Sequence, residues 1–165
     1  MKLLPKLSSI VILTALSLSS FATEMVSVER SITFSKHSNT PQKVVNECNL
    51  QTKIPLFLSK YAKGSVSLTD ETIGKQPKAL KLEISSVHAP GGGAWSGAKY
   101  VEVKGQLLEH GKVIASFVGS RYSTGGAFAG FKGTCSILGR CAKTIGKDIA
   151  RWLKNPIDGA MLGNS

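Results

Sequence analysis

The chain has 165 residues and carries 21 Lys and Arg side chains against 10 Asp and Glu, which gives a formal net charge of +11. Such an excess of positive charge favours anionic partners and argues against cationic ones. The length suits one ordinary domain with its own hydrophobic core, and the sequence shows no internal repeat.

The N-terminus has the pattern of a cleavable secretory signal peptide. Lys2 and Lys6 flank the start of an uncharged apolar run over residues 7–18, and the small residues Ser20 and Ala22 follow at the spacing that signal peptidase requires. A membrane span needs roughly 20 apolar residues. Because this run is shorter, a permanent anchor is disfavoured.

We therefore predict cleavage between Ala22 and Thr23 and a periplasmic or secreted protein. Residues 1–22 would be the signal peptide, and residues 23–165 a single mature α+β domain without a transmembrane span. The signal peptide contains two lysines and no acid, so the mature chain keeps 19 basic and 10 acidic side chains and a net charge of +9.

The spacing of apolar residues predicts the first elements. Residues 26–34 alternate between apolar and polar side chains, as a strand with one buried face does. Thr40 before Pro41 is typical of a helix start, and apolar residues then recur at helical spacing as far as Tyr61. Pro55 interrupts this stretch, and because proline removes a helical hydrogen bond, we expect one kinked helix or two short ones.

The middle of the chain predicts a series of strands. A short strand is expected at residues 66–68, a strongly amphipathic one at 80–84, and two longer ones at 100–108 and 113–122. Gly111 lies between the last two. Since glycine adopts positive φ without steric cost, we expect a hairpin turn there.

The last helix, which ends before Pro156, has two chemically different sides. At ~100° per residue, its basic side chains lie close to 180° from its apolar ones. Two hypotheses stay open for the basic side: a contact surface for an anionic partner, or an ordinary solvated helix face. The apolar side consists of Leu138, Ala142, Ile145, Ile149, Trp152 and Leu153, and the basic side of Arg140, Lys143, Lys147, Arg151 and Lys154.

Together these elements predict an α+β fold with the order β-α-β-β-β-β-α. We expect a largely antiparallel sheet of four to five strands with two helices packed on one face. No segment after the leading apolar run is apolar enough to cross a bilayer.

Three cysteines remain after export, Cys48, Cys135 and Cys141, and in an oxidising compartment two of them are expected to pair. If the last helix starts at Cys135, six residues of helical rise place Cys141 ~9 Å along the axis, beyond the Cα separation of about 7 Å that a disulfide tolerates. Either that helix begins later or Cys48 is a partner. We predict a bridge between Cys48 and Cys135 that ties the two helices together.

Aromatic side chains occur in two glycine-rich loops. Trp95, Phe128 and Phe131, with Lys132 beside them, are candidate contact residues because exposed aromatics on loops often meet sugars, lipid interfaces or other proteins. The alternative is that the aromatic rings fold back over the sheet and close the core. The second loop does not fit a nucleotide site, since Phe131 and Gly133 interrupt the spacing of a Walker loop.

The sequence contains no recognisable catalytic constellation. Ser96 and Lys99 have the spacing of penicillin-recognising serine enzymes, but they lie in a loop entering a strand and the companion elements are missing. His37, His88 and His110 lack a second ligand at the spacing of a metal site. We therefore predict no catalytic residues, no metal and no cofactor. Glycosidase chemistry uses a pair of carboxylates, and nothing in the sequence brings two acids together. Only the fold could pair two of the candidates, which are Asp70, Glu71, Glu83, Glu102 and Glu109.

Three segments of the chain are similar to segments of a known protein family: residues 47–53 (ECNLQTK), 87–93 (VHAPGGG) and 131–141 (FKGTCSILGRC). Residues 152–156 continue this similarity. They resemble a family of small secreted proteobacterial proteins of uncharacterised function. The resemblance spans most of the mature chain and implies a bacterial periplasmic or secreted location, but no activity. The order of elements is also similar, at the level of fold only, to the small α+β domain at the N-terminus of TolB.

The sequence thus predicts a non-catalytic envelope protein that binds an anionic or macromolecular partner. Candidate partners are lipid headgroups, lipopolysaccharide, acidic polysaccharide or another envelope protein, whereas nucleotides are disfavoured because the exported compartment lacks ATP. Two alternatives stay open. One is a small periplasmic hydrolase, which requires its polar side chains to lie within hydrogen-bond reach, and the other is an inhibitor or immunity-like partner of another protein.

Overall fold

The computed structural model describes residues 24–74, 76–91, 93–126 and 129–163. The predicted signal peptide, its cleavage site before Thr23 and the loop residue Phe128 lie outside these ranges. No helix within the described ranges combines the length and the apolar character that a membrane span requires.

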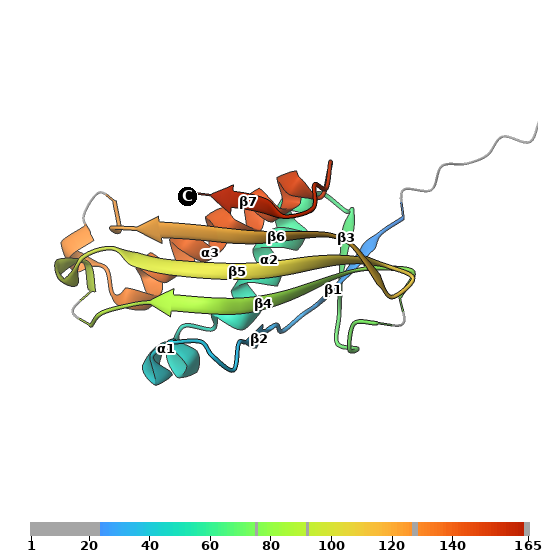
Figure 1. Cartoon of the computed structure of the whole chain (residues 1–165). Helices are drawn as coiled ribbons and strands as arrows, with labels where there is room; N and C mark the ends of the chain where they lie inside the picture. Colours follow the sequence, from blue (N-terminus) through green and yellow to red (C-terminus); the bar gives the residue numbers. More distant parts are fainter. Residues whose placement is uncertain (1–23, 75, 92, 127–128, 164–165) are drawn as a thin grey trace, which may run out of the picture.

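Three long antiparallel strands form the centre of the sheet (Figure 1): β4 (Lys78–His88), β5 (Lys99–Glu109) and β6 (Lys112–Ser123). Along most of β5, buried residues alternate with partly or fully exposed ones, as expected for a strand with one covered face. The turn between β5 and β6 consists of His110 and Gly111, whose φ angles are 49° and 78°. Two positive φ angles are typical of a type I′ turn, so the predicted hairpin is confirmed.

Short parallel strands extend this centre on both sides: β1 (Val26–Glu29), β2 (Thr33–Phe34), β3 (Val66–Thr69) and β7 (Ala160–Gly163). The sheet order is β3-β1-β4-β5-β6-β7, and β2 pairs with β4. The strand expected over residues 26–34 is therefore divided in two. β7 was not predicted, because four residues next to glycines carry too little alternation to mark a strand.

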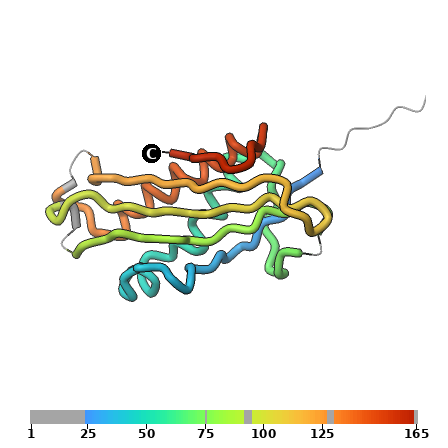
Figure 2. Tube along the Cα trace, in the orientation of Figure 1, coloured from blue at the N-terminus to red at the C-terminus, as the bar shows by residue number. Residues whose placement is uncertain are grey.

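Two helices, α2 (Leu50–Ala62) and α3 (Thr134–Trp152), cover one face of the sheet and leave the other face open (Figures 1 and 2). A shorter helix, α1 (Gln42–Glu47), lies beside one edge, and two 3₁₀ turns, η1 (Gly93–Ser96) and η2 (Ala129–Phe131), lie in the glycine-rich loops. The predicted α+β class, with its two main helices on one face, is confirmed.

Pro55 does not break the first helical segment where the sequence suggested. The break falls at Asn49, which has a φ of 52° and separates α1 from α2, while Pro55 remains inside α2. Proline at this position leaves the carbonyl of Gln51, four residues earlier, without its helical donor. The backbone N–H of Ile32 donates to that carbonyl at 3.0 Å. The segment between β1 and β2 therefore satisfies the group that the proline leaves free.

The two main helices approach each other closely and run in the same direction. A Cβ atom on Gly146 of α3 would lie 2.8 Å from the backbone nitrogen of Leu58 and 2.8 Å from Cβ of Phe57, so only glycine fits this crossing. Beneath the helices, the rings of Phe117 and Trp152 meet edge to face with centroids 4.9 Å apart. This contact packs the end of α3 onto β6.

A disulfide joins the N-terminal ends of the two main helices. Cys48 and Cys135 form the bond with their Cα atoms 4.8 Å apart, as predicted. Cys141, two turns along α3, is a buried free thiol. Burial raises the pKa of Cys141 to about 11, which keeps this thiol protonated and unreactive near neutral pH.

Candidate functional site

Helix α3 has one buried and one exposed side, as its sequence predicts. The side chains expected to face the core are buried, except for Leu153, which is partly buried. All members of the predicted basic side are exposed: Arg140, Lys143, Lys147, Arg151 and Lys154. We call this set the basic side of α3. What it contacts stays a prediction.

A groove of about 190 Å³ lies between α2 and α3, near their C-terminal ends. Lys63, which directly follows α2, contributes a cation to this groove that the sequence did not connect with the last helix. Lys63 caps α2 in a left-handed conformation with a φ of 50°. The groove is lined by Tyr61, Lys63, Lys147, Ala150, Arg151 and Lys154.

The charge of this groove is only weakly offset by acids. Within the described residues, Arg151 is the one lining cation with a carboxylate partner, Asp148, at 3.7 Å from Nη1 to Oδ1. Both helix C-termini carry partial negative charge that attracts cations, which accounts for part of this clustering. Lys147 lies before the last turn of α3, so the helix dipole does not explain its position. An anion in this groove would meet cations that are exposed to water.

One acidic side chain is buried beneath the basic side of α3. Asp148 accepts a hydrogen bond from Nε of Arg121 at 2.7 Å, and the Asp148 side chain is only 9% exposed. This pair fixes α3 to β6 and sets the position of the neighbouring Lys147 and Arg151. The sequence analysis did not identify it, because the partners are 27 residues apart and belong to different elements.

The glycine-rich loops place two aromatic rings in solvent at the other end of the helices. Trp95 is 86% exposed and Phe131 is 92% exposed. The alternative that the rings close the core is therefore wrong for Trp95 and Phe131, while Phe128 lies outside the described residues. Trp95 Nε1 donates to the carbonyl of Gly130 at 3.2 Å, which joins the two loops.

The cations beside these rings bind the loop itself. Lys132 Nζ and Arg140 Nη1 both donate to the carbonyl of Gly125, at 2.9 and 2.8 Å. These two bonds close the second glycine-rich loop against the start of α3. Whether Lys132 also meets a partner stays a prediction.

The spacing of Ser96 and Lys99 corresponds to a contact in the fold. Lys99 begins β5 with its side chain on the helix-covered side, where it is fully buried, and Nζ donates to Ser96 Oγ at 2.7 Å. Ser96 Oγ in turn donates to the carbonyl of Pro90 at 3.1 Å. Burial lowers the pKa of Lys99, because the charged ammonium loses its hydration there.

A second polar cluster lies on the open face of the sheet. Ser85 Oγ and the hydroxyl of Tyr100 donate to the two carboxylate oxygens of Glu102, at 2.6 and 2.7 Å. The Ser85 hydrogen bond is the main cause that lowers the pKa of Glu102. Burial, followed by the contact with Glu102, raises the pKa of Tyr100 to about 12. Glu102 therefore stays ionised and fully engaged, which makes it a poor general acid.

The other acids considered for glycosidase chemistry do not join Glu102 in a hydrogen-bonded pair among the described residues. Asp70 accepts from Arg30 at 2.9 Å near the end of β3, and Glu109 lies 3.8 Å from Lys78 at the hairpin end. Among all the residues that the structure describes, no group of three or more His, Cys, Asp or Glu side chains is arranged to hold a metal ion. His37, His88 and His110 are all exposed.

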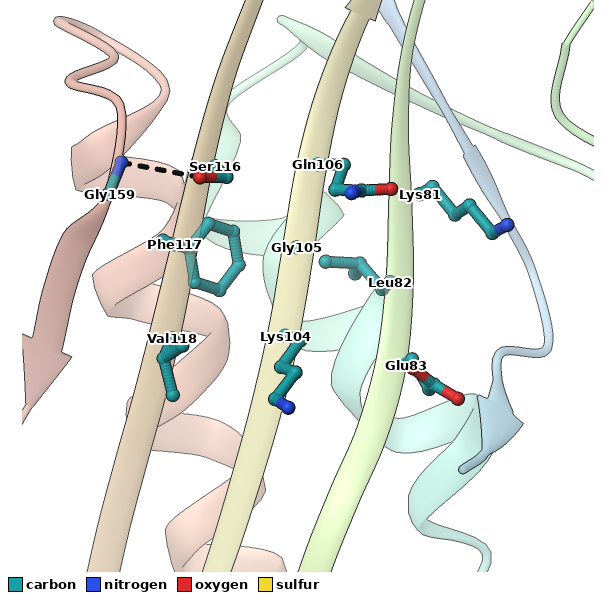
Figure 3. Close-up of a pocket in the computed structure, with 10 residues that line it drawn as sticks. All are labelled: Lys81, Leu82, Glu83, Lys104, Gly105, Gln106, Ser116, Phe117, Val118 and Gly159. Carbon is teal, nitrogen blue, oxygen red and sulfur yellow. Dashed lines mark hydrogen bonds between the residues drawn. The ribbon is translucent and has the colours of Figure 1, made fainter. Parts of the chain in front are cut away.

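A hollow of about 380 Å³ lies over the central strands (Figure 3). Its charged members, Lys81, Glu83 and Lys104, form no ion pair with one another in the described structure. At one edge, the backbone N–H of Gly159 donates to Ser116 Oγ at 3.3 Å. The hollow therefore offers mixed charge on an open strand surface, without an activated nucleophile or base.

Comparison by sequence identifies no relative: no family model matches the chain, and no curated protein matches it. Among solved structures, a protein described only as uncharacterised shares 13% identity, with a TM-score of 0.50 over 79% of this chain and 92% of that one. A likeness of this kind establishes a shared fold and nothing about activity.

Two further solved structures are similar at a lower level. The PelC dodecamer from Paraburkholderia phytofirmans has 14% identity and a TM-score of 0.47, over 76% of this chain and 89% of that one. A hypothetical protein from Chlamydia trachomatis has 12% identity and a TM-score of 0.47, over 78% and 98%. The similarity to the TolB domain stays a prediction.

Proposed function

We propose that the protein is a binding module of the bacterial envelope, periplasmic or secreted, and that it holds an anionic partner at a non-catalytic surface. The contact surface would be the basic side of α3 together with the groove between α2 and α3. The observation that supports this most is the convergence of four cations from two helices on one groove. A merely solvated helix face would not require a contribution from the end of α2.

The groove suits a compact anionic group. Its volume of about 190 Å³ leaves room for a phosphate or carboxylate group with a few waters, since water occupies roughly 30 Å³ in the liquid. In the envelope, such groups belong to lipid headgroups, lipopolysaccharide and acidic polysaccharides. The rest of the basic side would then lie along the anionic surface around the bound group.

Binding to anionic vesicles tests this proposal. We expect the purified protein to sediment with phosphatidylglycerol-containing vesicles and with lipopolysaccharide at low salt, and to be released as salt rises, because screening weakens exposed charge pairs. The double variant Lys143→Glu with Lys147→Glu should weaken binding at least tenfold. A matched control, Lys81→Glu with Lys104→Glu, makes the same change in net charge on the open face of the sheet.

The control decides between a site and a general attraction. If both double variants weaken binding equally, total charge rather than the basic side of α3 drives the interaction, and the proposal fails. Absence of binding at low salt to vesicles, lipopolysaccharide and acidic polysaccharide alike would also remove it.

The alternative of an inhibitor or immunity-like protein draws on different residues. It rests on Trp95 and Phe131, which are exposed and joined through the contact between their loops. A stable protein partner captured from an envelope extract, and lost in Trp95→Ala with Phe131→Ala, would favour this alternative over the anionic surface.

A further inference from the structure

The contact between Ser96 and Lys99 stands out because a buried cation is costly. Lys99 is fully buried at the start of β5, and it forms no ion pair with a carboxylate of any described residue. Its ammonium donates to Ser96 Oγ at 2.7 Å and lies 3.4 Å from the carbonyl oxygen of Gly97. An apolar side chain would fill the same space without losing hydration. A lysine in this position therefore calls for an explanation beyond packing.

We propose that Ser96 is a nucleophile for acyl transfer and that Lys99 is the general base that activates it. Lys99 and the serine hydroxyl already lie within hydrogen-bond distance, the first requirement for proton transfer between them. The inference concerns a site separate from the basic groove and goes beyond the proposed binding function.

The chemistry balances with water as the only co-reactant. Neutral Lys99 takes the hydroxyl proton while Ser96 Oγ forms a bond to the carbonyl carbon of an ester. The bond from that carbon to the alcohol oxygen breaks, and the leaving alkoxide takes the proton from Nζ. Lys99 then removes a proton from water, whose oxygen attacks the acyl carbon. The bond from that carbon to Ser96 Oγ breaks, Oγ takes the proton back from Nζ, and a carboxylic acid is released.

The surroundings of Ser96 favour an apolar acyl group. Ser96 is half-buried at the end of η1, directly after the exposed Trp95, and η2 with the exposed Phe131 contacts η1. A Cβ atom on Gly130 would lie 3.2 Å from the Trp95 ring, so glycine allows the ring to lie against the second loop. The loops next to Ser96 therefore carry two exposed aromatic rings. We infer that the substrate class is carboxylic esters with an apolar acyl chain.

No acid among the described residues is paired with Lys99 to hold its proton, and a contact that α3 makes with this residue is neutral. The Cys141 thiol donates to the backbone carbonyl of Lys99 at 3.7 Å, and burial raises the pKa of that thiol to about 11. The lowered pKa of Lys99 agrees with a base that gives up its proton more readily than a solvated lysine does. The titratable or charged groups at this end of the neighbouring elements include Tyr100 of β5 itself, His88 of β4, Arg121 and Tyr122 of β6, Lys132 before α3, and Arg140 and Cys141 of α3.

An alkyl fluorophosphonate, which labels activated serines, tests the proposal on the purified protein. Intact mass and peptide mapping should show one adduct on Ser96, absent from Ser96→Ala and retained in the control Ser136→Ala, an exposed serine at the same end of the molecule. The wild-type labelling rate should rise with pH to a plateau whose midpoint lies below 10.5, the ordinary pKa of lysine.

Removal of the base provides the second readout. Lys99→Met should lower the labelling rate by about 100-fold, the contribution expected of a general base, with an unchanged circular dichroism spectrum. If this variant does not fold, the wild-type pH profile decides. Three results would each overturn the proposal: wild-type labelling no faster than that of Ser96→Ala, an adduct on another residue, or a labelling rate that does not change with pH. A structural role of Lys99 alone would produce those results.

Discussion

The lysines at the two ends of the α2–α3 pair lie in opposite environments, exposed at one end and buried at the other. At the C-terminal end, Lys63, Lys147 and Lys154 are exposed around an open groove. At the other end, beside the glycine-rich loops, Lys99 is fully buried against a serine hydroxyl. A hydrated ammonium keeps its charge and exchanges counterions with a partner, whereas a desolvated one gives up its proton more easily. In the two roles that we propose, burial rather than the count of basic residues separates the binding surface from the chemical group.

The largest expected effect lies at the loop end, where the disulfide closes the N-terminal ends of the helices. Replacing Cys48 and Cys135 by alanine opens a loop of 87 residues, and we expect the free energy of unfolding to fall by about 4 kcal/mol through the gain in unfolded-state entropy. Urea unfolding of the double variant measures this. The basic groove lies at the far end, so vesicle binding by the folded fraction should stay within twofold.

A loss of less than 1 kcal/mol in that experiment would show that packing alone holds the loop end together. The single-site control Cys141→Ala removes a buried thiol without touching the bridge. Cys141→Ala should lower the free energy of unfolding clearly less than the double variant does.

The groove end depends on a buried ion pair. Asp148→Ala would leave the Arg121 guanidinium, 24% exposed, without its carboxylate, and we expect a loss of about 3 kcal/mol in the free energy of unfolding. Thermal or urea unfolding checks this. Asp70→Ala removes an exposed pair with Arg30 as a control and should cost under about 1 kcal/mol. Equal costs would mean that the Asp148 pair does not fix α3 to the sheet.

The contribution of α2 to binding can be isolated with one substitution. Lys63→Gln removes one groove cation and should weaken binding to anionic vesicles about fivefold, or about 1 kcal/mol. Lys104→Gln on the open face makes the same change in charge and should leave affinity nearly unchanged. If Lys63→Gln binds like the wild type, the groove is not part of the contact and the basic side of α3 acts alone.

The smallest effect concerns the buried lysine and carries a distinctive pH dependence. Because the pKa of Lys99 is lowered in the folded state, the unfolded chain binds this proton more tightly, and folding becomes more favourable as pH rises toward 10.5. Lys99→Met lacks this dependence. We expect the free energy of unfolding of the variant to exceed that of the wild type by about 1 kcal/mol near pH 7. This difference should narrow as pH rises. Tyr100 and Cys141 titrate in both proteins and cancel in the difference.

Unfolding curves of the two proteins between pH 7 and pH 10, compared pairwise, provide the measurement. A constant gap across this range would mean that Lys99 keeps an ordinary pKa in the fold. The opposite trend, a gap that widens with pH, would mean that the folded protein holds the proton more tightly than the unfolded chain does.

Local patterns in the sequence predicted much of the fold. Alternation marked the central strands, Gly111 marked the hairpin, and helical periodicity separated the two sides of α3. These features depend on neighbours within one element, so a single segment contains the information. Helix geometry argued only against a bridge between Cys135 and Cys141, and the bridge that we predicted between Cys48 and Cys135 is the one that forms.

The features that were not predicted depend on contacts between distant segments. Pro55 remains helical because Ile32, far earlier in the chain, supplies the donor for the carbonyl that the proline leaves free. Lys63 joins the basic side of α3 only because the two helices run in the same direction. The buried position of Lys99 follows from its register on β5, which the loop-like sequence before it concealed.

The central claim, that an anion occupies the groove between α2 and α3, is tested most directly by a backbone amide NMR titration with small phosphatidylglycerol-containing bicelles. The account predicts that the largest chemical-shift changes fall on Lys63, Lys147 and Arg151, that the amides of β4 and β5 on the open face change little, and that salt reverses the shifts. Changes centred on the open face, or on the loops around Trp95 with none at the groove, would contradict it.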